Sequence, residues 1–331
     1  MSAPTPPEGV QAGFELARLT TVRTGGRAEW FARAADEDAL LGLLAWAREA
    51  GLPVAVVGSG SNLLVADEGV RGLVVKLAGR LTRIEVRSPR IICGAGARLP
   101  AVATQAARAG LSGIEFGVNI PGTVGGAVRM NANAYDGQLG RVLEWVDVAA
   151  AAHTPGEAAS DPGPHDMAFQ QGLQRRTPDQ LGLAYRSSNL LDGEIVVRAS
   201  LLLAPADVDV VKATISDMRN RRHDAQPQGI KTFGSTFKNP PDPRAGGRTA
   251  GQLLADAHCN GLAVGGARFA PKHANFIENT GSATTADIVA LMAEGRRRVQ
   301  ERFGVELEAE AHTLGPVGFP WRARPQSDER D

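Results

Sequence analysis

Hydrophobic residues recur at helical spacing in four stretches of this chain. Residues 36–50 place leucines and a tryptophan on one side, with acidic residues in the first turn and Gly51 directly after the last turn. These are the start and stop signals of an amphipathic helix. Further helices are predicted over 99–109, 208–222 and 285–303.

Short apolar runs rich in β-branched residues alternate with these helices and predict extended segments. They cover residues 53–57, 63–65, 72–77, 83–93 and 194–203. Strands interspersed with helices, without one regular alternation, favour an α+β class.

Two glycine-rich stretches interrupt the pattern. Residues 58–62 read Gly-Ser-Gly-Ser-Asn after a predicted strand, and glycines let main-chain N–H groups approach an anion. A plain turn explains this stretch equally well, and a Rossmann fold is disfavoured because extended chain, not a helix, follows it. Residues 117–134 predict a long, tightly turned loop, packed either against a ligand or only against itself.

Length and charge narrow the class of partner. A chain of 331 residues is long enough for two or three compact units. Its 36 basic and 36 acidic residues give a formal net charge of zero, so neither nucleic acid nor an anionic membrane is an expected partner. We expect a small-molecule partner instead. No secretory signal and no run of eighteen apolar residues is apparent, which predicts a cytoplasmic protein.

Cysteine and histidine usage predicts neither a disulfide framework nor a metal site. Only Cys93 and Cys259 occur, far apart and outside any CxxC motif, and the six histidines lack ligand spacing. Residues 149–164 are rich in alanine, proline and glycine, which predicts an exposed or flexible insertion.

Several short motifs in a fixed order resemble the UDP-N-acetylenolpyruvoylglucosamine reductase family. The resemblance runs from about residue 17 to residue 315. Its motifs are Thr24-Gly25-Gly26, GSGSN at 58–62, NIPGTVGGAV at 119–128, AYRSSN at 184–189, GSTFKNP at 234–240, KHANFIEN at 272–279 and LEAE at 307–310.

The resemblance implies an α+β fold with a two-subdomain FAD-binding module of the vanillyl-alcohol-oxidase type and a C-terminal α+β substrate domain. Its expected bounds are a flexible N-terminus at 1–16, the FAD module at 17–204, the substrate domain at 205–315 and a tail at 316–331. The chain looks like the shorter subclass, which lacks a substrate-capping tyrosine loop.

The implied reaction uses FAD and NADPH to reduce the enolpyruvyl group of UDP-N-acetylglucosamine-enolpyruvate. The product is UDP-N-acetylmuramate, a cytoplasmic precursor of peptidoglycan. A flavin oxidase of the same fold, acting on an alcohol or carbohydrate, is the alternative enzyme class. A flavin-binding scaffold is the non-enzyme alternative, and retention of all three expected catalytic residues argues against it.

The resemblance also assigns roles to individual residues. Arg186 is expected to hold the substrate carboxylate, Ser235 to donate a proton, and Glu310 to assist at the enolate. Glu308 would share a face with Glu310 in a regular strand, so only the resemblance selects Glu310. Weaker expected substrate contacts are Tyr185, Lys238, Asn239, Lys272 and Asn275.

The resemblance implies that the two glycine-rich loops contact the diphosphate of FAD. The expected cofactor-binding residues are Gly58, Ser59, Gly60, Ser61, Asn62, Leu63, Gly122, Thr123, Gly125, Gly126 and Ala127. Arg219, Arg221 and Arg222 either contact the nucleotide diphosphate or form a solvated basic helix end. Ala225 and the pair Ala311-His312 depart from the family pattern.

Overall fold

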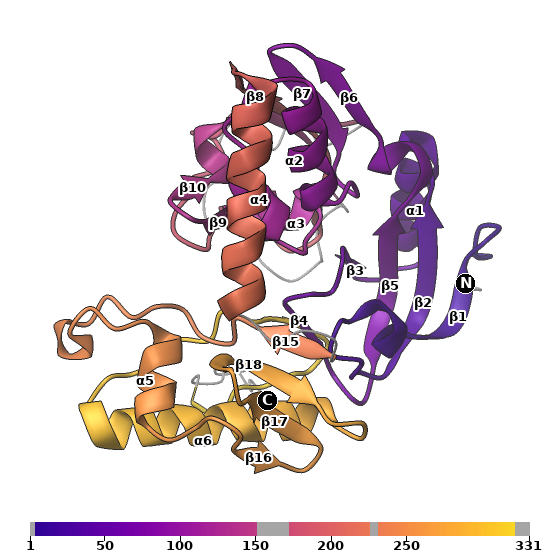
Figure 1. The fold of residues 1–331 in the computed structure, drawn as a ribbon. Coiled ribbons are helices and arrows are strands. Elements are labelled where there is room, and N and C mark those ends of the chain that lie inside the picture. The colour runs from indigo at the N-terminus through magenta and orange to yellow at the C-terminus, as the bar shows by residue number, and fades with distance from the viewer. Residues whose placement is uncertain (1–3, 151–171, 226–230, 322–331) are drawn as a thin grey trace. The chain divides into compact units, whose positions relative to one another are not determined.

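A computed structural model describes residues 4–150, 172–225 and 231–321. Main-chain contacts divide the chain into two compact units, drawn as a ribbon in Figure 1. The first unit comprises residues 1–14, 28–59 and 71–224, and the second comprises 15–27, 60–70 and 225–331. The division therefore differs from the expected boundary at 204/205, because the helix that follows that position packs with the first unit and two early segments pack with the second.

One sheet of the first unit has the order β1-β2-β5-β3, with β3 and β5 parallel. Its strands are β1 (Gln11–Glu15), β2 (Arg27–Ala34), β3 (Val54–Val56) and β5 (Val70–Leu77). Helix α1 (Glu37–Glu49) begins where predicted, because the side chain of Asp36 accepts a hydrogen bond from the Ala39 N–H at 3.0 Å. Its apolar side is buried through Leu40, Leu43, Leu44, Trp46 and Ala47.

A second, five-stranded sheet has the order β12-β11-β13-β7-β6 and is antiparallel throughout. Its strands are β6 (Ile84–Arg87), β7 (Arg90–Gly94), β11 (Leu143–Ala150), β12 (Gln174–Arg176) and β13 (Glu194–Leu202). The single strand predicted over 83–93 is thus a hairpin that turns at Ser88-Pro89, where proline offers no N–H for a continuous ladder. Most of the predicted insertion, residues 151–164, lies outside the described residues.

Three helices complete the core of the first unit: α2 (Leu99–Arg108), α3 (Val124–Arg129) and α4 (Val208–Ala225). The long α4 lies beside α2 in Figure 1, and the guanidinium of Arg219 donates to the Thr104 hydroxyl at 3.3 Å. The prediction of an irregular loop over 117–134 is partly wrong, because this stretch contains α3 and the end of a 3-10 helix at Glu115–Asn119. Short strand pairs are β8 (Leu111–Ser112) with β14 (Ala204–Pro205), and β9 (Asn133–Ala134) with β10 (Gly137–Gln138).

The second unit is built on an antiparallel sheet of order β15-β18-β17-β16. Its strands are β15 (Thr232–Gly234), β16 (Ala263–Val264), β17 (Ala267–Ala270) and β18 (His273–Asn279). Helices α5 (Ala250–Asp256) and α6 (Thr285–Phe303) pack with this sheet, and β4 (Leu63–Val65) pairs in parallel with β19 (His312–Leu314). The expected tail at 316–331 is not wholly peripheral, because Phe319 is buried in the core of this unit.

Helix α6 spans the predicted residues because both of its ends carry local signals. Thr284 and Asp287 form a reciprocal capping box at the start, and Gly304 adopts the left-handed conformation with φ of 67° at the end. No helix in the described part of the chain is long and apolar enough to cross a membrane.

Gly295 lies where α6 closely approaches the sheet. A Cβ at this position would lie 2.7 Å from the Phe269 ring and 3.0 Å from Leu254. We therefore expect Gly295→Val to lower the free energy of unfolding by about 1–3 kcal/mol through overpacking, measured by denaturant titration. Ala290→Val, at an exposed position of the same helix, serves as the control, and equal effects of the two substitutions would contradict the packing argument.

Candidate functional site

The two glycine-rich segments of the first unit touch each other. A Cβ placed on Gly58, just after β3, would lie 2.5 Å from the Thr123 Oγ1, just before α3. Only glycine permits this approach, so the sequence at Gly58 is dictated by the neighbouring loop. Small residues and the hydroxyl of Thr123 therefore meet at one place.

Most main-chain N–H groups at the start of α3 are already used within the protein. The N–H groups of Val124 and Gly125 donate to Ala97 and Ala95 carbonyls at 2.9 and 2.8 Å, and that of Ala127 donates to the Thr123 carbonyl. The Thr123 hydroxyl accepts from Gly126 at 3.4 Å. Contacts of Gly125, Gly126 and Ala127 to a ligand would therefore not use free N–H groups, and Gly122 and Thr123 are better placed for that role.

One cationic side chain contacts the first glycine loop, and two arginines act on its charge. Lys76 of β5 is partly buried and its ammonium donates to the Gly58 carbonyl. Burial lowers the pKa of Lys76, and the positive charges of Arg33 and Arg98 lower that pKa further. Because these like charges repel, an anion bound next to them would be favoured. Lys76 was not among the residues predicted from the sequence, since a single lysine in an apolar strand carries no pattern.

Arg186 lies in a tight turn of the first unit. Ala184 and Ser187 pair across this turn, which leaves Tyr185 and Arg186 at its tip. Arg186 has a left-handed backbone with φ of 56°, and its guanidinium donates to the Asn133 carbonyl at 3.3 Å. The guanidinium carbon lies 5.5 Å from the centre of the Tyr185 ring, which is 45% exposed.

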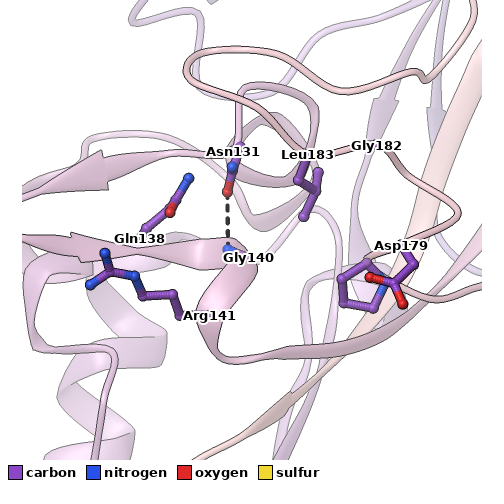
Figure 2. Close-up of a pocket in the computed structure, with 8 residues that line it drawn as sticks. Asn131, Gln138, Gly140, Arg141, Asp179, Gly182 and Leu183 are labelled. Carbon is purple, nitrogen blue, oxygen red and sulfur yellow. Dashed lines mark hydrogen bonds between the residues drawn. The ribbon is translucent and has the colours of Figure 1, made fainter.

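A cleft of about 450 Å³ lies next to this turn. Figure 2 shows its lining, in which the Asn131 amide faces the main chain of Gly140. The lining residues are Asn131, Gln138, Gly140, Arg141, Pro178, Asp179, Gly182 and Leu183. The walls are mostly polar, which suits water or a polar ligand better than an apolar one.

Ser235 and Glu310 lie on neighbouring antiparallel segments of the second unit. The Glu310 N–H donates to the Thr236 carbonyl at 2.9 Å, and the Lys238 N–H donates to the Glu308 carbonyl at 2.9 Å. Ser235 directly precedes this pairing. Glu310 is only 9% exposed, so a buried glutamate pairs with the residue that follows the serine.

The structure gives Glu308 and Glu310 different environments, which the alternation of side chains along the sequence does not do. Only an isolated bridge forms at Ala309, so 307–310 is not a regular strand, and the condition under which the two glutamates would share a face is not met. Glu308 is exposed and forms an ion pair with Lys238 at 2.7 Å, whereas Glu310 is buried. Lys238, a weaker candidate for a substrate contact, is thus engaged by a surface carboxylate.

Asn62 ends the first glycine loop and lies in the second unit. Its amide donates to the Glu310 carbonyl at 3.1 Å, and its own carbonyl accepts from the His312 N–H at 3.1 Å. Gly60, two residues earlier, has φ of 63° and would place a Cβ 2.0 Å from the Leu19 carbonyl oxygen. Part of the GSGSN motif is therefore explained by packing and by support of the glutamate segment.

The remaining predicted substrate contacts differ in their environments. Asn275 is 4% exposed, and its amide accepts from Thr236 and Phe237 and donates to the Phe237 carbonyl at 2.9 Å, so it holds the segment next to Ser235. Asn239 accepts from the Ala250 N–H at 3.1 Å, at the start of α5. Lys272 is exposed.

The basic end of α4 has mixed surroundings. Arg221 pairs with Asp217 at 2.8 Å on the helix surface. Arg222 is partly buried, and burial lowers the pKa of its guanidinium. Arg222 is therefore the member of this cluster whose charge a bound anion would stabilise most.

Comparison with known proteins accounts for both units. The C-terminal domain model of UDP-N-acetylenolpyruvoylglucosamine reductase matches residues 226–314, and an FAD binding domain model matches 28–152. A reductase of that name from Symbiobacterium thermophilum is 41% identical over 316 residues, covering 95% of this chain and 94% of the relative. The chain belongs to the UDP-N-acetylenolpyruvoylglucosamine reductase family.

Further relatives agree with this family assignment. A reductase of the same name from Gluconobacter oxydans is 39% identical over 94% of this chain and 92% of its own length. The crystal structure of the family member from Thermus caldophilus aligns with a TM-score of 0.73 at 35% identity, covering 92% of this chain and 98% of that chain. The predicted α+β class, with an FAD-binding module and a C-terminal substrate domain, is confirmed.

The residues at the glycine loops fit the diphosphate of FAD. Gly58 and Thr123 bring two small-residue segments together, and Ser59 and Thr123 carry hydroxyl groups in these segments. The ammonium group of Lys76, which donates to the Gly58 carbonyl, would supply compensating charge. These side chains would hold the cofactor while the main chain shapes the cradle.

Replacement of Lys76 tests this charge. We expect Lys76→Met to raise the FAD dissociation constant about 10-fold, because one cation beside a dianionic group is lost. Fluorescence titration of apoprotein with FAD measures this, and the difference should shrink at high salt as the charges are screened. Arg71→Met, at an exposed position of the same strand, is the control, and an unchanged affinity of Lys76→Met would exclude the role.

Proposed function

We propose that this protein reduces the enolpyruvyl group of UDP-N-acetylglucosamine-enolpyruvate with NADPH, giving UDP-N-acetylmuramate. One observation carries the proposal. The buried Glu310 lies on a segment that pairs with the residues directly after Ser235, in a chain that aligns over 95% of its length with a UDP-N-acetylenolpyruvoylglucosamine reductase. The substrate and NADPH are small molecules, and we place the reaction in the cytoplasm, in peptidoglycan precursor synthesis.

When bound, FAD would supply the redox chemistry, which is the passage of a hydride from NADPH to the enolpyruvyl methylene carbon. The addition leaves negative charge beside the substrate carboxylate, and a low-dielectric site must compensate that charge. We assign this task to Arg186, whose planar guanidinium can bind a carboxylate through two parallel N–H groups. It lies at the tip of a turn, next to the exposed Tyr185.

Ser235 is the proposed proton donor. The carbon next to the carboxylate receives the hydroxyl proton, so the product gains one hydride and one proton, and the serine recovers its proton from solvent. An alcohol is a weak acid, but an enolate-like intermediate is basic enough to take its proton at hydrogen-bond distance.

Glu310 is proposed to stabilise the enolate from beside Ser235. Its main chain is fixed on one side by Thr236 and on the other by the Asn62 amide. Ion pairing of Glu308 with Lys238 leaves Glu310 as the buried carboxyl of the motif. This arrangement favours an oriented carboxyl group over a solvated one.

The serine is tested by following the two half-reactions separately. We expect Ser235→Ala to be reduced by NADPH at close to the normal rate, and its reoxidation by the enolpyruvyl nucleotide sugar to slow by about 100-fold to 10000-fold. Anaerobic stopped-flow absorbance measures both steps. Ser282→Ala, at an exposed position of the same unit, is the control. A normal second step in Ser235→Ala would remove this serine from the mechanism.

The alternative oxidase activity makes a different prediction. The reductase should consume NADPH only when the enolpyruvyl nucleotide sugar is present, and should release little peroxide in air. Turnover with an alcohol or carbohydrate and oxygen alone, followed by peroxide detection, would instead favour the oxidase.

A further inference from the structure

Asn131 occupies a buried position between the glycine-loop helix and the turn that carries Arg186. It follows the end of α3 by two residues, is 1% exposed and has φ of 39°. Asparagine is among the few residues that tolerate this left-handed conformation. A buried amide must also satisfy its donor and acceptor groups within the protein.

Both ends of the Asn131 amide are used. Its oxygen accepts from the Gly140 N–H at 3.0 Å, as drawn in Figure 2, and its nitrogen donates to the Ala184 carbonyl at 3.1 Å. Ala184 forms the base of the turn that ends in Tyr185 and Arg186. The amide therefore connects that turn to the wall of the neighbouring cleft.

The residues around Asn131 hold the same loop at further points. The Arg129 carbonyl accepts from the Ser188 hydroxyl at 2.8 Å. The Arg129 guanidinium donates to the carbonyls of Leu190, Leu191 and Glu194 at 3.2, 3.0 and 2.9 Å. The Asn133 carbonyl accepts from the guanidinium of Arg186 itself. Residues 129–133 thus support the loop on both sides of its tip.

We propose that Asn131 is a positioning residue that fixes the Arg186 turn relative to the glycine-loop helix. The short α3 carries Thr123 at its start and Arg129 at its end, so one rigid piece connects the expected cofactor loop with the substrate arginine. The Ala184 carbonyl accepts from the Asn131 amide and from the Ser187 N–H within the turn. Loss of the Asn131 amide leaves only the bond within the turn, and the turn then samples other conformations. The catalytic part of this inference rests on the role proposed for Arg186.

Proteolysis tests the position of the turn without reference to catalysis. Trypsin cleaves after Arg186 only when the turn opens. We expect Asn131→Leu, which keeps the side-chain volume but loses both the amide hydrogen bonds and the tolerance of a left-handed backbone, to increase cleavage at this bond about 5-fold. Mass spectrometry of the FAD-loaded protein measures the rate. Asn189→Ala is the matched control, because that exposed amide of the same loop donates only to the Gln180 carbonyl. An unchanged cleavage rate in Asn131→Leu would overturn the positioning role.

Half-reaction kinetics test the consequence for the substrate. Asn131→Leu should bind FAD and be reduced by NADPH within about 2-fold of the unmodified protein, while the step with the enolpyruvyl nucleotide sugar slows about 10-fold. In an Arg186→Ala background the same substitution should cause no further loss, because Asn131 acts through the arginine. Independent losses in the two backgrounds, or equal slowing of both half-reactions, would overturn the inference.

Two controls keep the outcome interpretable. Ser188→Ala removes a single hydrogen bond of the same network and should give a smaller effect in the same direction, so it replaces Asn131→Leu if that variant does not fold. Faster cleavage at Arg186 together with a normal substrate step would mean that Asn131 does position the turn. The same result would contradict the role proposed for Arg186 in binding the substrate.

Discussion

The antiparallel pairing of residues 236–238 with 308–310 is the constraint on which the proposed chemistry depends. Two main-chain hydrogen bonds of 2.9 Å fix the register, and a shift by one residue would turn the side chain of Glu310 to the opposite face of the pairing. Asn275 holds one segment and Asn62 the other. The site is thus supported by the buried amide of Asn275 and the half-buried amide of Asn62, and leaving a buried donor or acceptor unpaired would be costly.

The first unit uses the same principle around Arg186. A turn exposed to solvent would sample many conformations, yet Asn131 and Arg129 engage its flanks from a segment that continues directly from α3. Two functional loops are therefore connected through a few hydrogen bonds to carbonyl groups. Such bonds restrict position without requiring a side chain to face the ligand.

Charge is distributed locally although the chain as a whole is neutral. Lys76 contacts one glycine loop and lies within the electrostatic influence of Arg33 and Arg98, and Arg222 is a partly buried cation at the end of α4. Such clusters repel in the absence of an anion and become favourable when one binds. The overall balance of 36 basic and 36 acidic residues concealed this arrangement and indicated only that large polyanions are not expected partners.

The sequence alone determined the helices whose ends are set by adjacent residues, because capping by Asp36, by Thr284 with Asp287 and by Gly304 acts over one turn. Its ordered motifs also determined the family. Tertiary structure decided that residues 124–129 form a helix, since their N–H groups meet the distant carbonyls of Ala95 and Ala97. It likewise separated Glu310 from Glu308 and gave Asn131 its partners, because those contacts join segments that no local pattern relates.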